Sequence, residues 1–288
     1  MNQKTGYTCL IGAPNSGKST MFNLLIKQKI SIVTHKAHTT RDKILGIITN
    51  YNTQLIFIDT PGYLKNPKHR LERLLTKKSL QEIRNVNFLC IVIDIATKNC
   101  LDDPLINTEY FDSKQQLILI FNKVDLIKEK KKLLHLVQKA KNKGFYKIFM
   151  VSALKNYGVK DLFNYLVFNA PKGIWPYKDT DVTTRNIKKL AEDITMENLY
   201  TLLNKELPYQ LKLQTESWKE KNNIITIHQS IMVLRNSQKK IILGTNGKNI
   251  KKISILSRKA IGILIKKPVH LYLFIKVSDW LNKENAIN

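Results

Sequence analysis

Long apolar runs are scarce in this chain of 288 residues. The longest, FLCIVIDIA at Phe88–Ala96, is much shorter than the roughly 20 residues that a helix needs to cross a bilayer. The first eight residues, MNQKTGYT, lack the apolar stretch of a secretory signal peptide. We therefore expect a cytoplasmic protein, neither secreted nor integral to a membrane.

Cysteine is also scarce, with only Cys9, Cys90 and Cys100 in the chain. An odd number cannot pair completely, and Cys9 and Cys90 lie within apolar, strand-like runs. This pattern excludes a disulfide framework and predicts reduced, buried thiols in a reducing compartment.

Acidic residues are few, since 22 Asp and Glu stand against 48 Lys and Arg, for a net charge of +26. A basic surface attracts nucleic acid or anionic lipid. A composition rich in Lys, Ile and Asn, typical of an AT-rich genome, explains an excess that runs through both halves of the chain. It does not explain residues 221–278, which contain twelve Lys or Arg and no acidic residue. We call this stretch the acid-free segment and consider it a candidate anion-binding surface.

The first 170 residues alternate apolar runs with amphipathic stretches, a pattern that predicts a three-layer α/β domain with a mostly parallel sheet. Ligands of such sheets bind at the carboxyl ends of the strands. The predicted strands are Thr8–Ala13, Gln54–Thr60, Phe88–Asp94, Gln115–Asn122 and Lys147–Ala153. The predicted helices are Ser19–Lys27, Arg70–Ile83, Lys128–Lys143 and Val159–Phe168.

A smaller domain follows a linker. The stretch Ala170–Thr180 carries two prolines, a glycine and little periodicity, so we expect a first domain at 1–170, a linker at 171–184 and a second domain at 185–288. The second domain reads as a compact α+β unit in the order α-β-β-α-α-β. Its predicted elements are a helix at Arg185–Leu203, strands at Tyr209–Glu216 and Ile224–Arg235, two helices around a GTNG loop with the second near Ile250–Leu264, and a strand at Val269–Val277.

The first domain opens with a phosphate-binding loop. GAPNSGKS at Gly12–Ser19 fits G-x-x-x-x-G-K-S/T directly after a strand and before a helix. The glycines allow successive backbone N–H groups to face phosphate oxygens, and the helix N-terminus adds its positive end. Lys18 would neutralise the β- and γ-phosphates, and the Ser19 hydroxyl would ligate Mg²⁺.

Three further motifs end later strands and specify the base. In DTPG, Asp59 would hold Mg²⁺ through water, and the N–H of Gly62 would sense the γ-phosphate. In NKVD, Asp125 would accept two hydrogen bonds from guanine, whereas adenine would leave this carboxylate unpaired, which is costly. Lys123 would lie over the base, and Asn122 would tie its loop to the first one. The stretch Ser152–Leu154 would set the Ala153 N–H against guanine O6.

A switch segment is expected between the first two motifs, in HKAHTTRDKILG at His35–Gly46. A GTPase needs a mobile threonine there that reaches Mg²⁺ only when the γ-phosphate is present. We choose Thr40, with Thr39 as the alternative. Tyr63 stands after DTPG, where signalling GTPases place a water-orienting glutamine, so we expect slow intrinsic hydrolysis.

These motifs resemble a known family. GAPNSGKST, HTTRD, DTPG and NKVD are similar to those of the translation-factor-related class of bacterial GTPases. LPY at Leu207–Tyr209, KKIILGTNGKNIKKI and PVHLYLFIKV resemble the type II KH domain of the Era family, and the match runs through essentially the whole chain. Ala13 and Ser16 replace residues that are often larger in that family, without removing a glycine, the lysine or the Mg²⁺ ligand.

The resemblance implies a GTPase that binds GTP, GDP and Mg²⁺, contacts the 3′ end of 16S ribosomal RNA and acts in assembly of the 30S subunit. It also implies K⁺ as a further cation, with Asn15 as a ligand. Some Era proteins associate peripherally with the inner membrane, so that location stays open beside the cytoplasm. We expect a monomer.

A KH domain clamps the backbone of about four single-stranded nucleotides with its G-x-x-G turn. We expect Gly244 and Gly247 to allow close approach of phosphate, with bases lying against Ile242, Ile250 and Ile253. The predicted RNA-binding residues are Ile242, Gly244, Thr245, Asn246, Gly247, Lys248, Lys251 and Lys252. The predicted catalytic residues are Lys18, Thr40 and Gly62, and the predicted metal ligands are Ser19, Thr40 and Asp59. The predicted nucleotide-binding residues are Gly12, Asn15, Ser16, Gly17, Lys18, Ser19, Thr20, Asp59, Gly62, Asn122, Lys123, Asp125, Ser152 and Ala153.

Two alternatives stay open. In the first, the second domain binds RNA regardless of nucleotide, and the nucleotide site serves only structure. In the second, the protein is a GTPase of the membrane surface whose basic face meets anionic lipid. The discrete GTNG loop argues against the lipid alternative, because lipid needs only diffuse charge.

Overall fold

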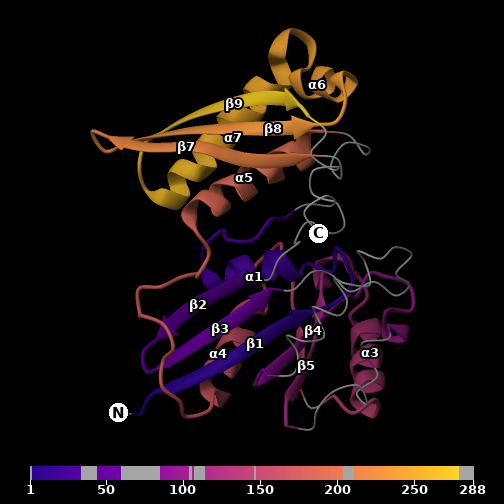
Figure 1. Ribbon diagram of the computed structural model, residues 1–288. Helices are drawn as coiled ribbons and strands as arrows, with labels where there is room; N and C mark the ends of the chain where they lie inside the picture. The colour runs from indigo at the N-terminus through magenta and orange to yellow at the C-terminus, as the bar shows by residue number, and fades with distance from the viewer. Residues whose placement is uncertain are drawn as a thin grey trace. The chain divides into compact units, whose positions relative to one another are not determined.

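The computed structural model describes residues 2–33, 44–59, 85–103, 106, 114–145, 147–203 and 211–278 (Figure 1). The chain divides into two compact units, Met1–Thr184 and Arg185–Asn288. Each unit is described by itself below. Among the described residues, no helix is long and apolar enough to cross a membrane.

The first unit is built on a six-stranded sheet in the order β2-β3-β1-β4-β5-β6. Only the β2–β3 pair is antiparallel, and the other neighbouring strands are parallel. The strands are β1 (Lys4–Ile11), β2 (Ile44–Asn50), β3 (Thr53–Asp59), β4 (Phe88–Asp94), β5 (Gln116–Asn122) and β6 (Lys147–Met150). The mostly parallel α/β sheet that the sequence predicts is therefore confirmed.

Strand β2 differs from the prediction made from the sequence. The sequence predicts a switch segment at residues 35–46, yet Ile44–Asn50 forms an edge strand paired along its whole length with β3. A tight turn joins the two strands, with Tyr51 at a φ of 52°. The pairing partner, rather than the apolar pattern of β2 itself, makes this segment a strand.

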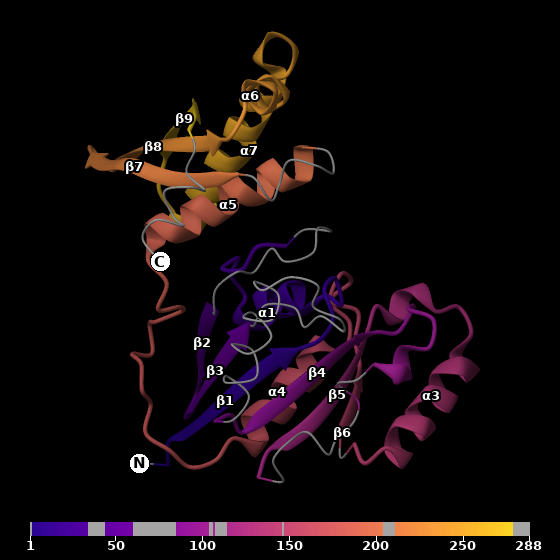
Figure 2. The same cartoon turned by 45° about the vertical axis from the view of Figure 1, so that its right-hand side comes forward.

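Helices cover both faces of the sheet. α1 (Lys18–Ile26) and α4 (Val159–Asn169) contact each other on one face, whereas α3 (Lys130–Asn142) packs on the other (Figure 2). All three helices lie within two residues of their predicted bounds. The predicted helix at Arg70–Ile83 falls outside the described residues. Two short 3-10 helices, η1 (Cys100–Asp102) and η4 (Val124–Leu126), follow β4 and β5.

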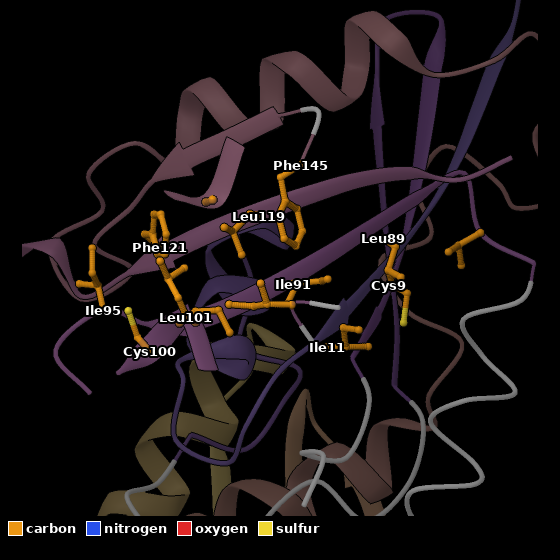
Figure 3. Close-up of a cluster of buried hydrophobic side chains, with 14 of the residues drawn as sticks. Cys9, Ile11, Leu89, Ile91, Ile95, Cys100, Leu101, Leu119, Phe121 and Phe145 are labelled. Carbon is orange, nitrogen blue, oxygen red and sulfur yellow. The ribbon is translucent and has the colours of Figure 1, made fainter. Parts of the chain in front are cut away.

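One hydrophobic cluster of the first unit lies between the sheet and α3, while α1 and α4 bury further side chains on the other face, among them Phe22 and Leu162. Figure 3 shows side chains of β1, β4 and β5, among them Ile11, Ile91 and Phe121, gathered with Phe145. None of the three cysteines, all of which lie in the described part of the chain, forms a disulfide, and all are buried. This confirms the predicted burial of the free thiols, and burial raises the pKa of the Cys90 thiol.

The predicted linker is hydrogen bonded along the first unit. The Trp175 Nε1 donates to the Lys4 carbonyl over 3.2 Å, and Gln54 exchanges two hydrogen bonds with the backbone of Tyr177. The Thr183 hydroxyl donates to the Leu45 carbonyl over 2.6 Å. Residues 171–184 are therefore held by hydrogen bonds against β1, β3 and β2.

The second unit is a three-stranded sheet with helices, in the predicted order α-β-β-α-α-β. Strand β8 lies between β7, which is antiparallel to it, and β9, which is parallel to it. The elements are α5 (Ile187–Leu202), β7 (Lys212–Lys221), β8 (Ile224–Val233), α6 (Asn236–Leu243), the 3-10 helix η6 (Thr245–Gly247), α7 (Lys248–Ile265) and β9 (Val269–Val277). The parallel β8–β9 pair needs a long crossover, which the α6–α7 hairpin provides.

Candidate functional site

The first glycine loop joins β1 to α1 and is held from β5. Gly17 is the N-cap of α1 at a φ of 96°. A Cβ there would lie 2.0 Å from Asn122 Nδ2, which donates to the Ser16 carbonyl over 2.8 Å. Glycine is thus needed at position 17 both for its positive φ and for the close approach of Asn122.

The Lys18 ammonium is buried inside this loop. Its Nζ donates to the carbonyls of Gly12 and Ala13 over 3.0 and 2.9 Å. Burial lowers the pKa of Lys18 to about 8, although the charges of Asp59 and Asp103 raise it. Among the described residues, the hydrogen-bond acceptors of this buried cation are neutral carbonyls, so the cation is well placed to receive an anion.

A buried carboxylate lies beside the loop, at the end of β3. Asp59 is 0% exposed, and its Oδ2 accepts hydrogen bonds from Ser19 Oγ over 2.9 Å and from Ser31 Oγ over 2.7 Å. Burial raises the pKa of the Asp59 carboxyl, against the hydrogen bond from Ser31, the charge of Lys18 and the hydrogen bond from Ser19. The motifs did not indicate Ser31, which reaches Asp59 only through the fold.

The Asp59 environment fits a divalent cation. Within the described part of the chain, the Asp59 Oδ1 is buried without a hydrogen-bond partner. An unpartnered carboxylate oxygen beside the Ser19 hydroxyl is a hard oxygen ligand set of the kind that Mg²⁺ takes, directly or through its bound water. The residues present therefore fit the predicted metal.

Asn122 connects two loops at the carboxyl edge of the sheet. Besides its bond to the Ser16 carbonyl, its Oδ1 accepts from the Ala153 N–H over 2.9 Å. The motif predicts that this N–H binds guanine O6, so a base bound here would share or replace the hydrogen bond to Asn122. Ser152 Oγ accepts from the Lys155 N–H over 3.1 Å, which orders the same loop.

The remaining NKVD residues differ in their exposure at this edge. Asp125 is exposed in η4, and Lys123 adopts a φ of 64° immediately before it. The Lys123 Nζ pairs with Asp94 Oδ2 over 2.6 Å, while Asp94 Oδ1 accepts from the Ala96 N–H over 3.0 Å. Asp94 was not among the predicted site residues, because its motif is only the polar end of an apolar strand.

Some of the other predicted site residues lie in the described part of the chain, and some do not. Asn15 is exposed at a φ of 62°, and Ser16 is buried beneath the loop. Thr20 is half-buried in the first turn of α1. Thr39, Thr40, Gly62 and Tyr63 lie outside the described residues.

The second glycine loop joins α6 to α7, as the sequence predicts for a G-x-x-G turn between helices. Thr245 and Asn246 are exposed at the tip, and exposed lysines follow in α7 at Lys248, Lys251 and Lys252. The loop therefore presents backbone and positive charge to solvent within the acid-free segment.

The structure corrects the prediction that RNA bases contact Ile242 and Ile253. Ile242 and Ile253 are 0% exposed and belong to the hydrophobic core with Leu199, Leu211 and Ile231. Neither has surface to offer a base. The sequence pattern does not distinguish these two cases, because apolar residues beside a loop have the same spacing whether they face a groove or the sheet.

Comparisons with known proteins agree with both halves of the chain. A family described as 50S ribosome-binding GTPase matches residues 7–123, and a family described as KH domain matches residues 206–281. GTPase Era of Mesorhizobium japonicum is 41% identical over 96% of this chain and 89% of its own length. GTPase Era of Afipia carboxidovorans is 40% identical over 96% of this chain and 90% of its own length.

Two solved structures are similar over the full length. An Era variant of Aquifex aeolicus bound to GDP and AlF4⁻ superposes with a TM-score of 0.89 and 28% identity, covering 99% of this chain and 98% of that one. Era in complex with MgGDPNP and nucleotides 1506–1542 of 16S ribosomal RNA gives a TM-score of 0.88 and 28% identity, covering 99% and 97%.

Proposed function

Because the chain belongs to the Era family of GTPases and hydrolyses GTP, we propose that it is a nucleotide-dependent switch that binds the 3′ end of 16S ribosomal RNA and assists assembly of the 30S subunit. The observation that carries this proposal is the pairing, in one chain, of the Ser19–Asp59–Asn122 arrangement with a basic G-x-x-G turn. The similar Era structure that holds both MgGDPNP and 16S RNA supports it.

The first unit supplies the GTP site. Lys18 would exchange its two carbonyl partners for phosphate oxygens, while Ser19 and Asp59 would hold Mg²⁺, which supplies charge neutralisation at the phosphates when bound. Asp125 would select guanine, with the stem of Lys123 over the base. Gly12, Asn15, Ser16, Gly17, Thr20, Ser152 and Ala153 complete the proposed site, together with Thr40 and Gly62.

A monovalent cation belongs to the same proposal. Asn15 is exposed on the loop and has a left-handed backbone conformation. Its side-chain oxygen would hold K⁺, which would supply further positive charge beside the phosphates. Hydrolysis should then be faster in K⁺ than in Na⁺.

The second unit supplies the RNA site. The exposed tip residues Thr245 and Asn246 would follow the RNA backbone, and the lysines at 248, 251 and 252 would meet its phosphates. Ile250, which is half-buried, is the apolar residue that remains available to a base. We assign GTP binding to residues 1–170 and RNA binding to residues 185–288.

The two rival functions predict different binding behaviour. A nucleotide-independent RNA-binding protein would hold RNA equally with GDP and with a GTP analogue. A membrane-surface GTPase would bind anionic vesicles in competition with RNA. The exposed, glycine-bounded turn favours RNA, because close approach of backbone to phosphate has no use on a lipid surface.

The test is binding of a labelled RNA from the 3′ end of 16S ribosomal RNA, titrated against salt. The wild type is compared with Gly247→Asp, each with GDP and with a non-hydrolysable GTP analogue. We expect tighter binding with the analogue and its loss in the variant, which places a carboxylate and an L side chain at a φ of 73°. Equal binding by the variant, with only a steep salt slope, would show that the acid-free segment acts as a diffuse polycation.

A further inference from the structure

The two glycines of the GTNG loop have different surroundings. A Cβ at Gly244 would lie 2.6 Å from Asn249 Cγ and 2.7 Å from Asn249 Nδ2. In the described part of the second unit, a Cβ at Gly247 would meet only Ile250 Cγ2 within 4 Å, at 3.9 Å. The space beside Gly244 is therefore filled from within the protein, whereas the space beside Gly247 is open to a ligand.

The group that fills this space also closes the end of α6. The Asn249 Nδ2 donates to the Ile241 carbonyl over 3.0 Å. This carbonyl belongs to the last four of α6, which the helix itself cannot satisfy. Asn249 stands in the first turn of α7, so one side chain joins the end of one helix to the start of the next across the loop.

The loop needs such a support because its backbone is unusual throughout. Gly244, Asn246 and Gly247 all have positive φ, at 69°, 51° and 73°. The Gly244 N–H donates to the Lys240 carbonyl over 2.9 Å, the Gly247 N–H donates to the Gly244 carbonyl over 3.2 Å, and the Lys248 N–H donates to the Thr245 carbonyl. A loop rich in glycine would otherwise sample many conformations, and ordering it on binding lowers affinity.

We propose that Asn249 is a positioning residue that holds the GTNG turn in the conformation that receives an RNA backbone. The inference rests on the proposed RNA-binding function of this turn. Asn249 acts from beneath the turn, through Gly244 and the Ile241 carbonyl. The contact with Asn249 explains why position 244 is a glycine, and this explanation needs no contact between Gly244 and RNA.

The first test removes the amide with Asn249→Ala. We expect RNA affinity to fall by about fivefold to tenfold, the range for loss of one hydrogen bond with its preorganisation. The slope of log affinity against log salt should not change, because no charge is removed. GTP hydrolysis without RNA should be unchanged. Asn186→Ala is the matched control, because Asn186 caps the start of α5 by accepting a hydrogen bond from the Lys188 N–H over 2.9 Å.

The second test is a double-mutant cycle with Gly244→Ala. The added methyl group collides with the Asn249 amide in the wild-type background, and much of that collision disappears in Asn249→Ala. The backbone strain of an alanine at a φ of 69° remains in both. We therefore expect Gly244→Ala to raise the RNA dissociation constant less in the Asn249→Ala background than alone. Additive effects would contradict a shared role.

Amide hydrogen exchange gives a readout that does not need RNA. In Asn249→Ala, the N–H groups of residues 245–248 should exchange faster, while those of β8 should not change. Unchanged exchange in the loop of Asn249→Ala would overturn the proposal. The proposal also fails if Asn249→Ala loses thermal stability as Asn186→Ala does but binds RNA within about twofold of wild type. If the wild-type protein fails to bind RNA, the proposed function fails, and exchange at residues 245–248 still decides whether Asn249 orders the turn.

Discussion

The pair of Lys123 and Asp94 shows how one residue outside the motifs can set the geometry of a motif. The ion pair is 2.6 Å long, and the side chains of Lys123 and Asp94 are 32% and 23% exposed. Asp94 is itself oriented by the Ala96 N–H. The lysine stem is thus drawn toward the end of β4, next to Asn122 in the β4–β5 register.

Asp94→Asn should speed the release of GDP. The carboxamide keeps the shape but loses the charge, so we expect dissociation about threefold to tenfold faster, a modest effect because the pair is partly exposed. Release of a fluorescent GDP analogue measures this rate. Glu220→Gln, which removes a surface pair with Lys267 in the second unit, should leave the rate unchanged. Identical release from Asp94→Asn and wild type would show that Asp94 does not position Lys123.

The lowered pKa of Lys18 predicts that the protein takes up a proton when it binds nucleotide at alkaline pH. Its pKa is lowered to about 8 by burial, so part of the ammonium is neutral at pH 8.5 before phosphate arrives. Phosphate favours the charged form, and GDP binding at pH 8.5 should therefore take up a proton. Calorimetry in buffers of different ionisation enthalpy measures this uptake, without Mg²⁺ and at pH 6.5 for comparison. Uptake at pH 6.5 equal to that at pH 8.5 would exclude Lys18 as its source.

The same group affects stability with a definite sign. The pKa of Lys18 is lower in the folded protein than its ordinary value of 10.5. The unfolded chain therefore binds more protons between pH 8 and 10.5, and the nucleotide-free protein gains stability from this group as pH rises through that window. The burial penalty is fully present below pH 8.

At the scale of elements, α1 and β5 meet at one glycine. Gly17 begins α1, and Asn122 ends β5 with its Nδ2 directly against the Gly17 backbone. The hydrogen bond from Asn122 to the Ser16 carbonyl sets the spacing of the two elements. The conformation of the phosphate-binding loop thus depends on a strand more than 100 residues away in the sequence.

Gly17→Ala should therefore disrupt the contact between the start of α1 and Asn122 at the end of β5. The methyl group would lie 2.0 Å from Asn122 Nδ2 at a φ of 96°, and we expect GDP affinity to fall by about 100-fold or more. Calorimetric titration with GDP measures this loss, and circular dichroism checks the fold. Gly173→Ala is the control, since its Cβ would meet Thr5 Cβ at 3.3 Å without an unusual φ. GDP affinity within the range of the control would contradict the inferred contact.

The sequence pattern predicts that Ile242 of α6 contacts RNA, whereas its packing predicts a role in stability. Ile242 is fully buried against α5, β7 and β8. Ile242→Ala should lower the free energy of unfolding by about 2–4 kcal/mol, as for other truncated core side chains. RNA affinity of the folded protein should be retained. Denaturant unfolding followed by RNA titration measures both, with Ile255→Ala, at a residue 46% exposed, as control. Loss of RNA affinity without loss of stability would restore Ile242 to the interface.

At the scale of the whole molecule, the question is whether the charge of +26 binds RNA generally or at one place. The double substitution Lys251→Ala and Lys252→Ala should reduce the salt slope of RNA binding by about 2, one for each phosphate contact removed. The matched control is Lys139→Ala with Lys141→Ala on α3, two exposed lysines of the first unit. Equal reductions in both proteins would indicate diffuse attraction by the whole surface.

Much of the fold could be predicted because its signals are local. The continuous apolar runs of β3, β4 and β5 predict buried parallel strands, and the alternation of Val269–Val277 predicts β9 within its observed bounds. The unpredicted strand, β2, carries a weaker pattern, ILGIITN, and depends on its pairing with β3. The predicted strand at Tyr209–Glu216 begins outside the described residues, and it ends at Glu216, whereas β7 runs to Lys221.

The amino-acid sequence alone determined the motifs and hence the predicted chemistry, because a loop proposed to bind phosphate, a carboxylate proposed to bind guanine and a G-x-x-G turn each need particular residues at contiguous positions. The tertiary structure alone decided which distant side chains support them. Ser31 against Asp59, Asp94 against Lys123 and Asn249 beneath Gly244 are side-chain contacts that no motif spacing encodes. Ile242 likewise faces the core and not a groove. Such contacts depend on which faces meet when strands and helices pack, and this is a property of the assembled fold.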